Sequence, residues 1–145
     1  MRILNSGRLR VVLSLPIKPP VLRKFDSLPE GHILHTVRGD QCVPLLQDGE
    51  VIVVTDQTGL DFDQGDWYLI EFADGCDEQS GLYRYKREIV VPVSASGSWW
   101  TVTPIQLTRS EIFSAVGPHH SYKHLASKLL GKVVGIYAPR APHLD

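Results

Sequence analysis

The segment from residue 37 to residue 54 constrains the fold more than any other part of the chain. It reads Val-Arg-Gly-Asp-Gln-Cys-Val-Pro-Leu-Leu-Gln-Asp-Gly-Glu-Val-Ile-Val-Val. Glycine adopts positive φ angles without a Cβ clash, so Asp48-Gly49 between apolar runs predicts a turn. The β-branched run 51–54 is too short for a helix and predicts a strand. Gly39 and Pro44 mark a turn and a bend before it.

Most of the remaining chain repeats this pattern of short β-prone runs between glycine, proline and polar residues. A 145-residue chain with 43% hydrophobic and 21% charged residues suits one ordinary hydrophobic core. We therefore expect a mostly β fold with one short helix over residues 121–130, ended by Gly131. Pro92 predicts an edge position for its strand. The expected strands are residues 8–15, 32–37, 51–55, 67–72, 82–87, 88–93, 99–103 and 131–137.

The 37–54 segment resembles the nucleophile motif of the LexA/UmuD/phage-repressor family, the S24 serine peptidases. That motif is apolar-x-Gly-Asp-Ser-Met-x-Pro, followed by Asp-Gly-Asp and an apolar strand. Three later stretches resemble family motifs in family order: Gly65-Asp66 before a strand, Tyr85-Lys86-Arg87, and the closing residues 131–137. The resemblance covers roughly residues 34–137. The positions of the first motif that fit are Gly39, Asp40, Pro44, Asp48 and Gly49.

The resemblance implies the twisted, partly closed antiparallel sheets of the LexA C-terminal domain. We assign residues 34–145 to this domain and residues 1–33 to an N-terminal arm and lead-in strand. Family members attack a peptide bond with a serine that a neutral lysine activates. This chain has Gln41-Cys42 where the family has Ser-Met, and an amide is no nucleophile. Lys86 matches the lysine, so the resemblance implies a vestigial dyad in which Lys86 donates a hydrogen bond to Gln41; the alternative is that Lys86 is an ordinary charged strand residue.

The function that we infer is that of a catalytically silent domain of a bacterial or phage regulator, acting through self-association or protein binding. The alternative is an S24-type self-processing peptidase in which Cys42 acts with Lys86, since a thiolate near a lysine is a competent nucleophile. Against it, Cys42 occupies the packing position of the family's methionine. The sequence also lacks the Ala-Gly bond that self-cleaving members cut.

The expected partner is a second copy of the chain, or another protein, in a reducing cytoplasmic compartment. Trp99 and Trp100 are adjacent on an expected strand and so face opposite sides, which leaves one of them for an interface. The closing strand offers Val133 and Ile136 at an edge that invites pairing. The family's dimers imply the same region. A third hypothesis is an arm that binds nucleic-acid phosphates through Arg2, Arg8, Arg10, Lys18, Arg23 and Lys24.

Other classes of function find little support. The net charge of −1 does not indicate a general polyanion binder, and residues 1–33 lack the two periodic segments of a helix-turn-helix that reads DNA directly. No apolar run is long enough to cross a membrane. The aspartates of residues 56–64 lack calcium-loop spacing. Nothing indicates a cofactor or a metal; His119, His120 and His124 lack the further ligands of a zinc motif and suggest an exposed helix start.

Overall fold

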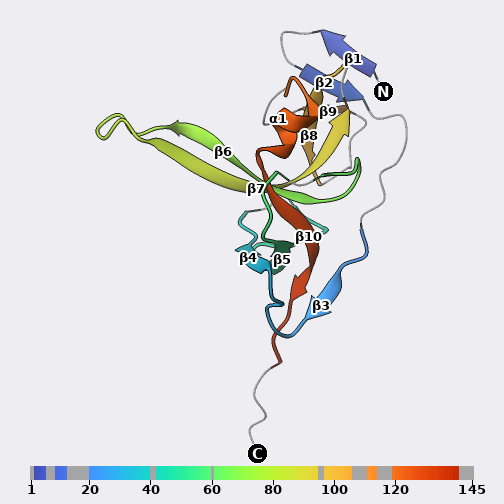
Figure 1. Ribbon diagram of the computed structural model, residues 1–145, viewed down its shortest axis with the longest axis vertical. Coiled ribbons are helices and arrows are strands. Elements are labelled where there is room, and N and C mark those ends of the chain that lie inside the picture. Colours follow the sequence, from blue (N-terminus) through green and yellow to red (C-terminus); the bar gives the residue numbers. More distant parts are fainter. Residues whose placement is uncertain are drawn as a thin grey trace, which may run out of the picture.

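The computed structural model describes residues 2–5, 9–12, 20–39, 42–59, 61–94, 97–105, 111–113 and 119–140. Within these residues the chain is mostly antiparallel β-sheet with one short helix, as the sequence predicts (Figure 1). No helix in the described ranges is long and apolar enough to span a membrane. The elements are β1 (Arg2–Asn5), β2 (Leu9–Val12), β3 (Arg23–Phe25), β4 (His32–Thr36), β5 (Val51–Thr55), β6 (Tyr68–Cys76), β7 (Tyr83–Ser94), β8 (Trp100–Pro104), β9 (Glu111–Phe113), α1 (Tyr122–Ala126) and β10 (Leu129–Tyr137).

The larger of two sheets has the strand order β4-β5-β10-β6-β7-β8, and β3 adds a short parallel pairing with β10. A smaller sheet has the order β1-β2-β9 and lies at the opposite end of the molecule from β3 (Figure 1). In the larger sheet β10 runs between β5 and β6. The closing strand is therefore an interior strand, because β6 pairs with Leu129–Lys132 and β5 pairs with Val133–Ile136.

The helix is shorter than the sequence predicts. Ser121 caps its first turn by accepting the backbone N–H of His124 at 3.1 Å, and the helix ends at Ala126. Leu129 then pairs with Ile70 of β6, so the apolar spacing that suggests a longer helix continues into a strand. Gly131 is not a helix stop. It lies in β10 where a Cβ would overlap the backbone oxygen of Thr55, so glycine permits this close approach of two strands.

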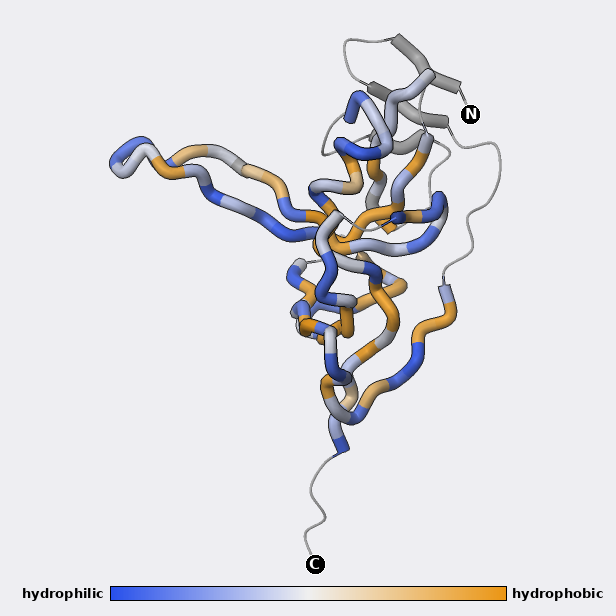
Figure 2. The backbone as a smooth tube through the Cα atoms, in the orientation of Figure 1, coloured by the Kyte–Doolittle hydropathy of each residue, from blue (hydrophilic) through white to orange (hydrophobic). Residues whose placement is uncertain are grey.

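Among the described residues, the buried side chains form two core clusters. One includes Val37, Cys42, Trp67 and Val133, and the other surrounds Phe62 and the helix. Hydrophobic residues accordingly gather where β6, β7 and β10 cross (Figure 2). In the second cluster the Phe62 ring stacks on Tyr122 at 4.1 Å and meets Trp100 edge-on at 5.0 Å, although Phe62 lies in a segment that the sequence marks as a polar loop.

Strand β7 replaces the two expected strands 82–87 and 88–93 with one continuous strand. Its residues Tyr83–Arg87 are exposed, whereas Ile89–Val93 are buried. Pro92 pairs with Val102 of β8 but lies beyond the last β6 pair, Tyr68 with Val90, so only one of its flanks is paired. The exposed half of β7 and the matching half of β6 leave the body as a two-stranded hairpin, which we call the ribbon and define as residues 71–87 (Figure 1).

Candidate functional site

Backbone hydrogen bonds hold the 37–50 segment in a closed loop. Val37 donates to the oxygen of Glu50 and accepts from the N–H of Gly49, both at 2.8 Å. Asp48 accepts the backbone N–H of Gly39 on Oδ1 at 2.8 Å. Gly39 and Gly49 have φ angles of 79° and 90°, which glycine adopts without strain. Gly39, Asp48 and Gly49, three of the predicted motif residues, therefore hold the two ends of this loop together next to Val37.

The middle of the loop carries Cys42 and Pro44. The Val43–Pro44 peptide bond is cis, and the Cys42 oxygen accepts the N–H of Leu46 at 2.9 Å. Cys42 and Leu46 are buried in the first core cluster, whereas Pro44 is exposed. Two predicted positions, Asp40 and the vestigial nucleophile position Gln41, lie outside the described residues.

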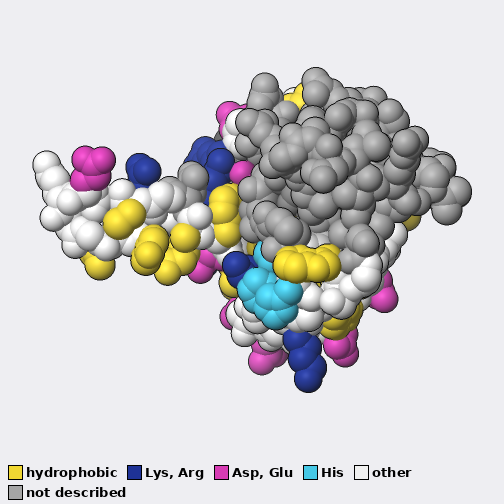
Figure 3. Space-filling model, turned by 90° about the horizontal axis from the view of Figure 1, so that it is seen from above, with side chains coloured by type: hydrophobic (Ala, Val, Ile, Leu, Met, Phe, Trp, Pro, Cys, Tyr) yellow, Lys and Arg dark blue, Asp and Glu magenta, His cyan; other side chains and the backbone are white. Residues whose placement is uncertain are grey.

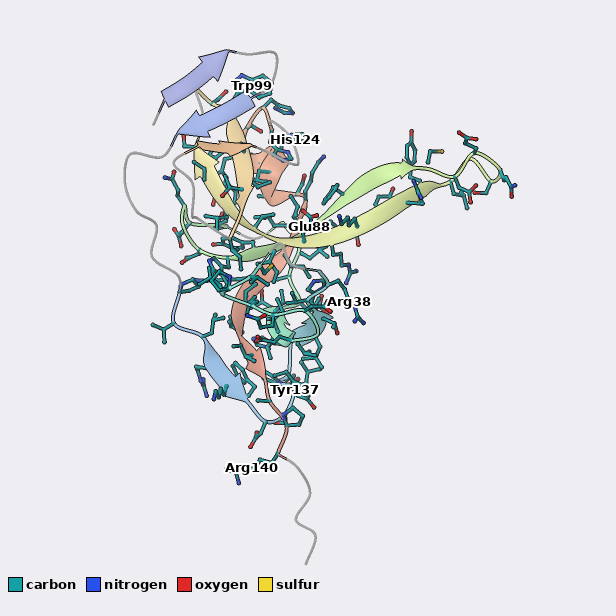
Figure 4. The ribbon with its side chains drawn as sticks, turned by 180° about the vertical axis from the view of Figure 1, so that it is seen from behind. Arg38, Glu88, Trp99, His124, Tyr137 and Arg140 are labelled. Atoms are coloured by element: carbon teal, nitrogen blue, oxygen red, sulfur yellow. The ribbon has the colours of Figure 1, made fainter. Side chains whose placement is uncertain are left out.

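A pocket of about 100 Å³ opens where this loop meets the root of the ribbon. Cys42 reaches it from the loop and Lys86 reaches it from β7, so two of the predicted site residues, far apart in sequence, line one cavity. Figure 4 shows Glu88 at the root of the ribbon and Arg38 on the neighbouring part of the body. The full lining is His35, Val37, Arg38, Cys42, Lys86, Arg87, Glu88 and Ile89.

Glu88 is the central charged group of the pocket. Its Oε1 lies 3.1 Å from Nζ of Lys86, and its side chain is only 14% exposed. The two residues are separated by one position on β7, and alternate residues of a strand share a face. A carboxylate at this distance stabilises the charged ammonium form of lysine, and that form cannot accept a proton.

The Cys42 thiol is kept protonated by its surroundings. Burial, and then the charge of Glu88, raise the pKa of Cys42 to about 11. At pH 7 a thiol with that pKa is ionised in roughly one molecule in ten thousand. The neighbouring His35 has a lowered pKa, because of burial and of the positive charges of Arg87 and Arg38. The pocket thus holds a neutral thiol beside a lysine paired with a carboxylate.

We compared the chain with family models, with curated proteins and with solved structures. None of the three comparisons finds a match. Sequence reasoning did not select Glu88, His35 or Arg38; the spacing of Lys86 and Glu88 on one strand face is the signal by which Glu88 could have been found.

Of the three histidines that the sequence suggests as an exposed helix start, His120 is exposed, whereas His119 and His124 are not. His119 is buried with 1% exposure, and its backbone exchanges two 2.7 Å hydrogen bonds with Trp100. The His124 ring stacks on His120 at 4.3 Å and lies 5.3 Å from the His119 ring. Within the described segments, no group of three or more histidine, cysteine or acidic side chains is placed to hold a metal ion.

The four predicted interface residues have different surroundings. Trp99 is 45% exposed and meets His120 edge-on, whereas Trp100 packs against the second core cluster. Val133 is 2% exposed and Ile136 packs against the first cluster. Ile136 pairs with both β5 and β3, and Val133 pairs with β5 and donates its N–H to the oxygen of Trp67, so neither position offers the free strand edge on which the prediction depended. Of the four, Trp99 is the residue with a largely accessible ring.

Proposed function

We propose that this chain is a catalytically silent domain of the LexA/S24-peptidase type, which acts in regulation by self-association or by binding another protein. The observation that carries the proposal is the pocket shared by Cys42 and Lys86. Lys86 matches the family's general base and Cys42 is the alternative nucleophile, yet the surroundings of both are unsuited to these roles. The thiol is protonated, and the lysine is paired with Glu88.

Catalysis by Cys42 would need a thiolate, and a lysine that acts as general base must be neutral. Glu88 opposes both requirements, since its negative charge disfavours a second negative charge on Cys42 and favours a positive charge on Lys86. The resemblance puts Gln41 at the serine position, and an amide offers no substitute nucleophile. A binding role requires neither a thiolate at Cys42 nor a neutral amine at Lys86, so it agrees better with the pocket than a peptidase role does.

Two measurements test the silent site. The purified chain, incubated at pH 9–10, should stay intact at every protein concentration. A specific cut at a concentration-independent rate, abolished by Cys42→Ala, would show an enzyme and overturn the proposal.

The second measurement is thiol labelling. In the folded chain, a neutral thiol reagent should label the exposed Cys76 much faster than the buried Cys42, and in denaturant it should label both at equal rates. The variants Cys42→Ser and Cys76→Ser each leave one thiol and so show which labelling rate belongs to which cysteine.

A further inference from the structure

The ribbon exposes several large apolar side chains to solvent. Leu82, Tyr83 and Tyr85 are 69%, 66% and 66% exposed. An isolated two-stranded hairpin is only marginally stable in water. Exposed aromatic side chains that lie together on such a hairpin are typical of a surface that another molecule covers.

One face of the ribbon carries these aromatic rings. Tyr83 and Tyr85 are two residues apart on β7 and so share a face, and their partners on β6 are Cys76 and Ala73. All four residues are exposed. Arg84 and Lys86 alternate with the tyrosines and belong to the other face. Figure 3 shows hydrophobic side chains gathered along one side of the ribbon.

Charge is distributed unevenly along the ribbon. Asp77 and Glu78 are exposed at its tip, where Asp77 also accepts the backbone N–H of Gln79. At the root, the three basic residues Arg38, Lys86 and Arg87 lie near two acidic ones, since Lys86 pairs with Glu88 at 3.1 Å and Arg87 pairs with Glu71 at 2.9 Å. Figure 3 agrees, with acidic side chains near the outer end of the ribbon and basic ones nearer the body. The tip is therefore acidic, and the root carries an excess of one positive charge, three basic residues against two acidic ones.

We propose that two copies of the chain associate through their ribbons in antiparallel fashion, each aromatic face packed on the other. This inference rests on the proposed function, in that it names self-association as the mode of binding and the ribbon as its surface. A two-fold axis through the middle of the ribbon brings the acidic tip of each copy to the basic root of the other. Parallel ribbons would instead place acidic tips together, so the charges select the antiparallel arrangement.

The available area suits a dimer. A fully buried tyrosine covers about 150–250 Å², so the four two-thirds-exposed tyrosines of two copies supply about 500 Å². That is roughly half of the ~1,000 Å² that a stable interface needs. The rest comes from Leu82, Cys76 and the contact of each tip with the opposite root. No strand edge and no rearrangement of the body is required.

The arrangement fixes which residues meet across the axis. From Glu71 at the root to Gln79 at the tip there are nine residues, and the eight steps between them span about 26 Å at the rise of a strand. Its midpoint falls next to Cys76, so the Cys76 thiols of the two copies lie close to the axis and to each other. Ser80, at the tip, lies far from the Ser80 of the other copy. Disulfide trapping therefore distinguishes antiparallel from parallel pairing.

The first experiment is sedimentation equilibrium at micromolar concentration. Wild type should dimerise. The double variant Tyr83→Ala/Tyr85→Ala should dimerise at least tenfold more weakly, with an unchanged far-UV circular dichroism spectrum. Leu28→Ala, an exposed apolar residue outside the ribbon, is the matched control and should dimerise as wild type does. A monomeric wild type, or a tyrosine variant that dimerises normally, overturns the inference. Neither result bears on the silent site, which thiol labelling and the cleavage assay test separately.

The second experiment tests the geometry. Mild oxidation of Cys42→Ser protein should yield a covalent dimer through Cys76, whereas Cys42→Ser/Cys76→Ser/Ser80→Cys protein should not cross-link. Cross-linking through position 80 would show parallel ribbons and overturn the arrangement. Glu78→Lys and Arg38→Glu should each weaken the dimer several-fold, and the two changes combined should restore it. If the combined variant is no tighter than either single variant, the tip-to-root contact is wrong.

Discussion

The Nζ atom of Lys86 lies 3.1 Å from Oε1 of Glu88, two residues further along β7. The same carboxylate is one of the two causes of the raised pKa of Cys42. A single acidic side chain therefore influences the protonation of both groups that the alternative, a peptidase, would use. Two sequence positions that look independent, Cys42 and Lys86, are electrostatically linked through Glu88.

Replacing Glu88 should make Cys42 more reactive. In a Cys76→Ser background, Glu88→Gln removes the negative charge that disfavours the thiolate, so the pKa of Cys42 falls from about 11. We expect the rate of labelling by a neutral disulfide reagent to rise several-fold at pH 8, and the rate-against-pH curve to shift to lower pH. Glu78→Gln at the ribbon tip is the charge-matched control. An unchanged curve in Glu88→Gln would show that burial alone controls the thiol.

Gly131→Ala should strongly destabilise the chain. The added methyl group would overlap the backbone oxygen of Thr55, whose side chain also accepts the N–H of Lys132 at 2.8 Å. Backbone atoms of two paired strands cannot move apart cheaply, so we expect a loss of about 3 kcal/mol in the free energy of unfolding, measured in urea. Gly59→Ala is the control, because a Cβ there meets open space. Its positive φ angle should cost only about 1 kcal/mol. Equal losses in the two variants would argue against the close contact.

Asp48→Ala should weaken the 37–50 loop. The change removes the acceptor of the Gly39 N–H, and the expected loss is about 1 kcal/mol in the free energy of unfolding. Asp48→Asn keeps an oxygen acceptor at this position and should lose less. Asp56→Ala changes another exposed aspartate, which directly follows β5, and should leave stability within about 0.5 kcal/mol of wild type. If Asp48→Ala behaves like Asp56→Ala, the bond to Gly39 contributes nothing measurable.

Stability should fall as the pH drops below 6.5, partly because of His119. Burial, with the nearby charges of Lys128, His124 and His120, lowers the pKa of His119 to about 4. Between pH 6.5 and 4 the unfolded chain binds a proton that folded His119 does not, so stability is complete above pH 6.5 and is lost towards pH 4. His119→Leu should flatten this part of the curve of unfolding free energy against pH. A variant that keeps the wild-type slope from pH 7 to pH 5 would exclude His119 as a source of the dependence.

The strands were predictable where local chemistry determines them. The β-branched run 51–55 forms β5, and Asp48-Gly49 forms the turn before it with the positive φ angle that glycine allows. Long-range pairing decided what local pattern could not. Leu129 has helical spacing relative to Leu125, but its pairing with Ile70 places it in a strand. The extension of β6 to Cys76 depends in the same way on cross-strand partners in β7.

The candidate site was predictable only in part. The motif resemblance singled out Cys42 and Lys86, and the structure adds that they line one pocket. Glu88, His35 and Arg38 look like ordinary surface residues in the sequence, because their importance arises from strands that meet only in the folded chain. The interior position of β10 was not foreseen either, since being the last expected strand along the chain says nothing about being at the edge of a sheet.

The position of β10 has a consequence for how the chain is made. Strands β4 and β5, and strands β6 to β8, can pair within their own group as soon as each has left the ribosome, whereas β10 is synthesised after all of them. Until then β5 and β6 each keep an open flank, and Val54, Leu69 and Ile70 lack neighbours that β10 supplies. Such half-sheets are the species that associate wrongly during translation. A growing chain of this domain therefore passes through a vulnerable interval that ends only when residues 129–137 emerge and join its two parts.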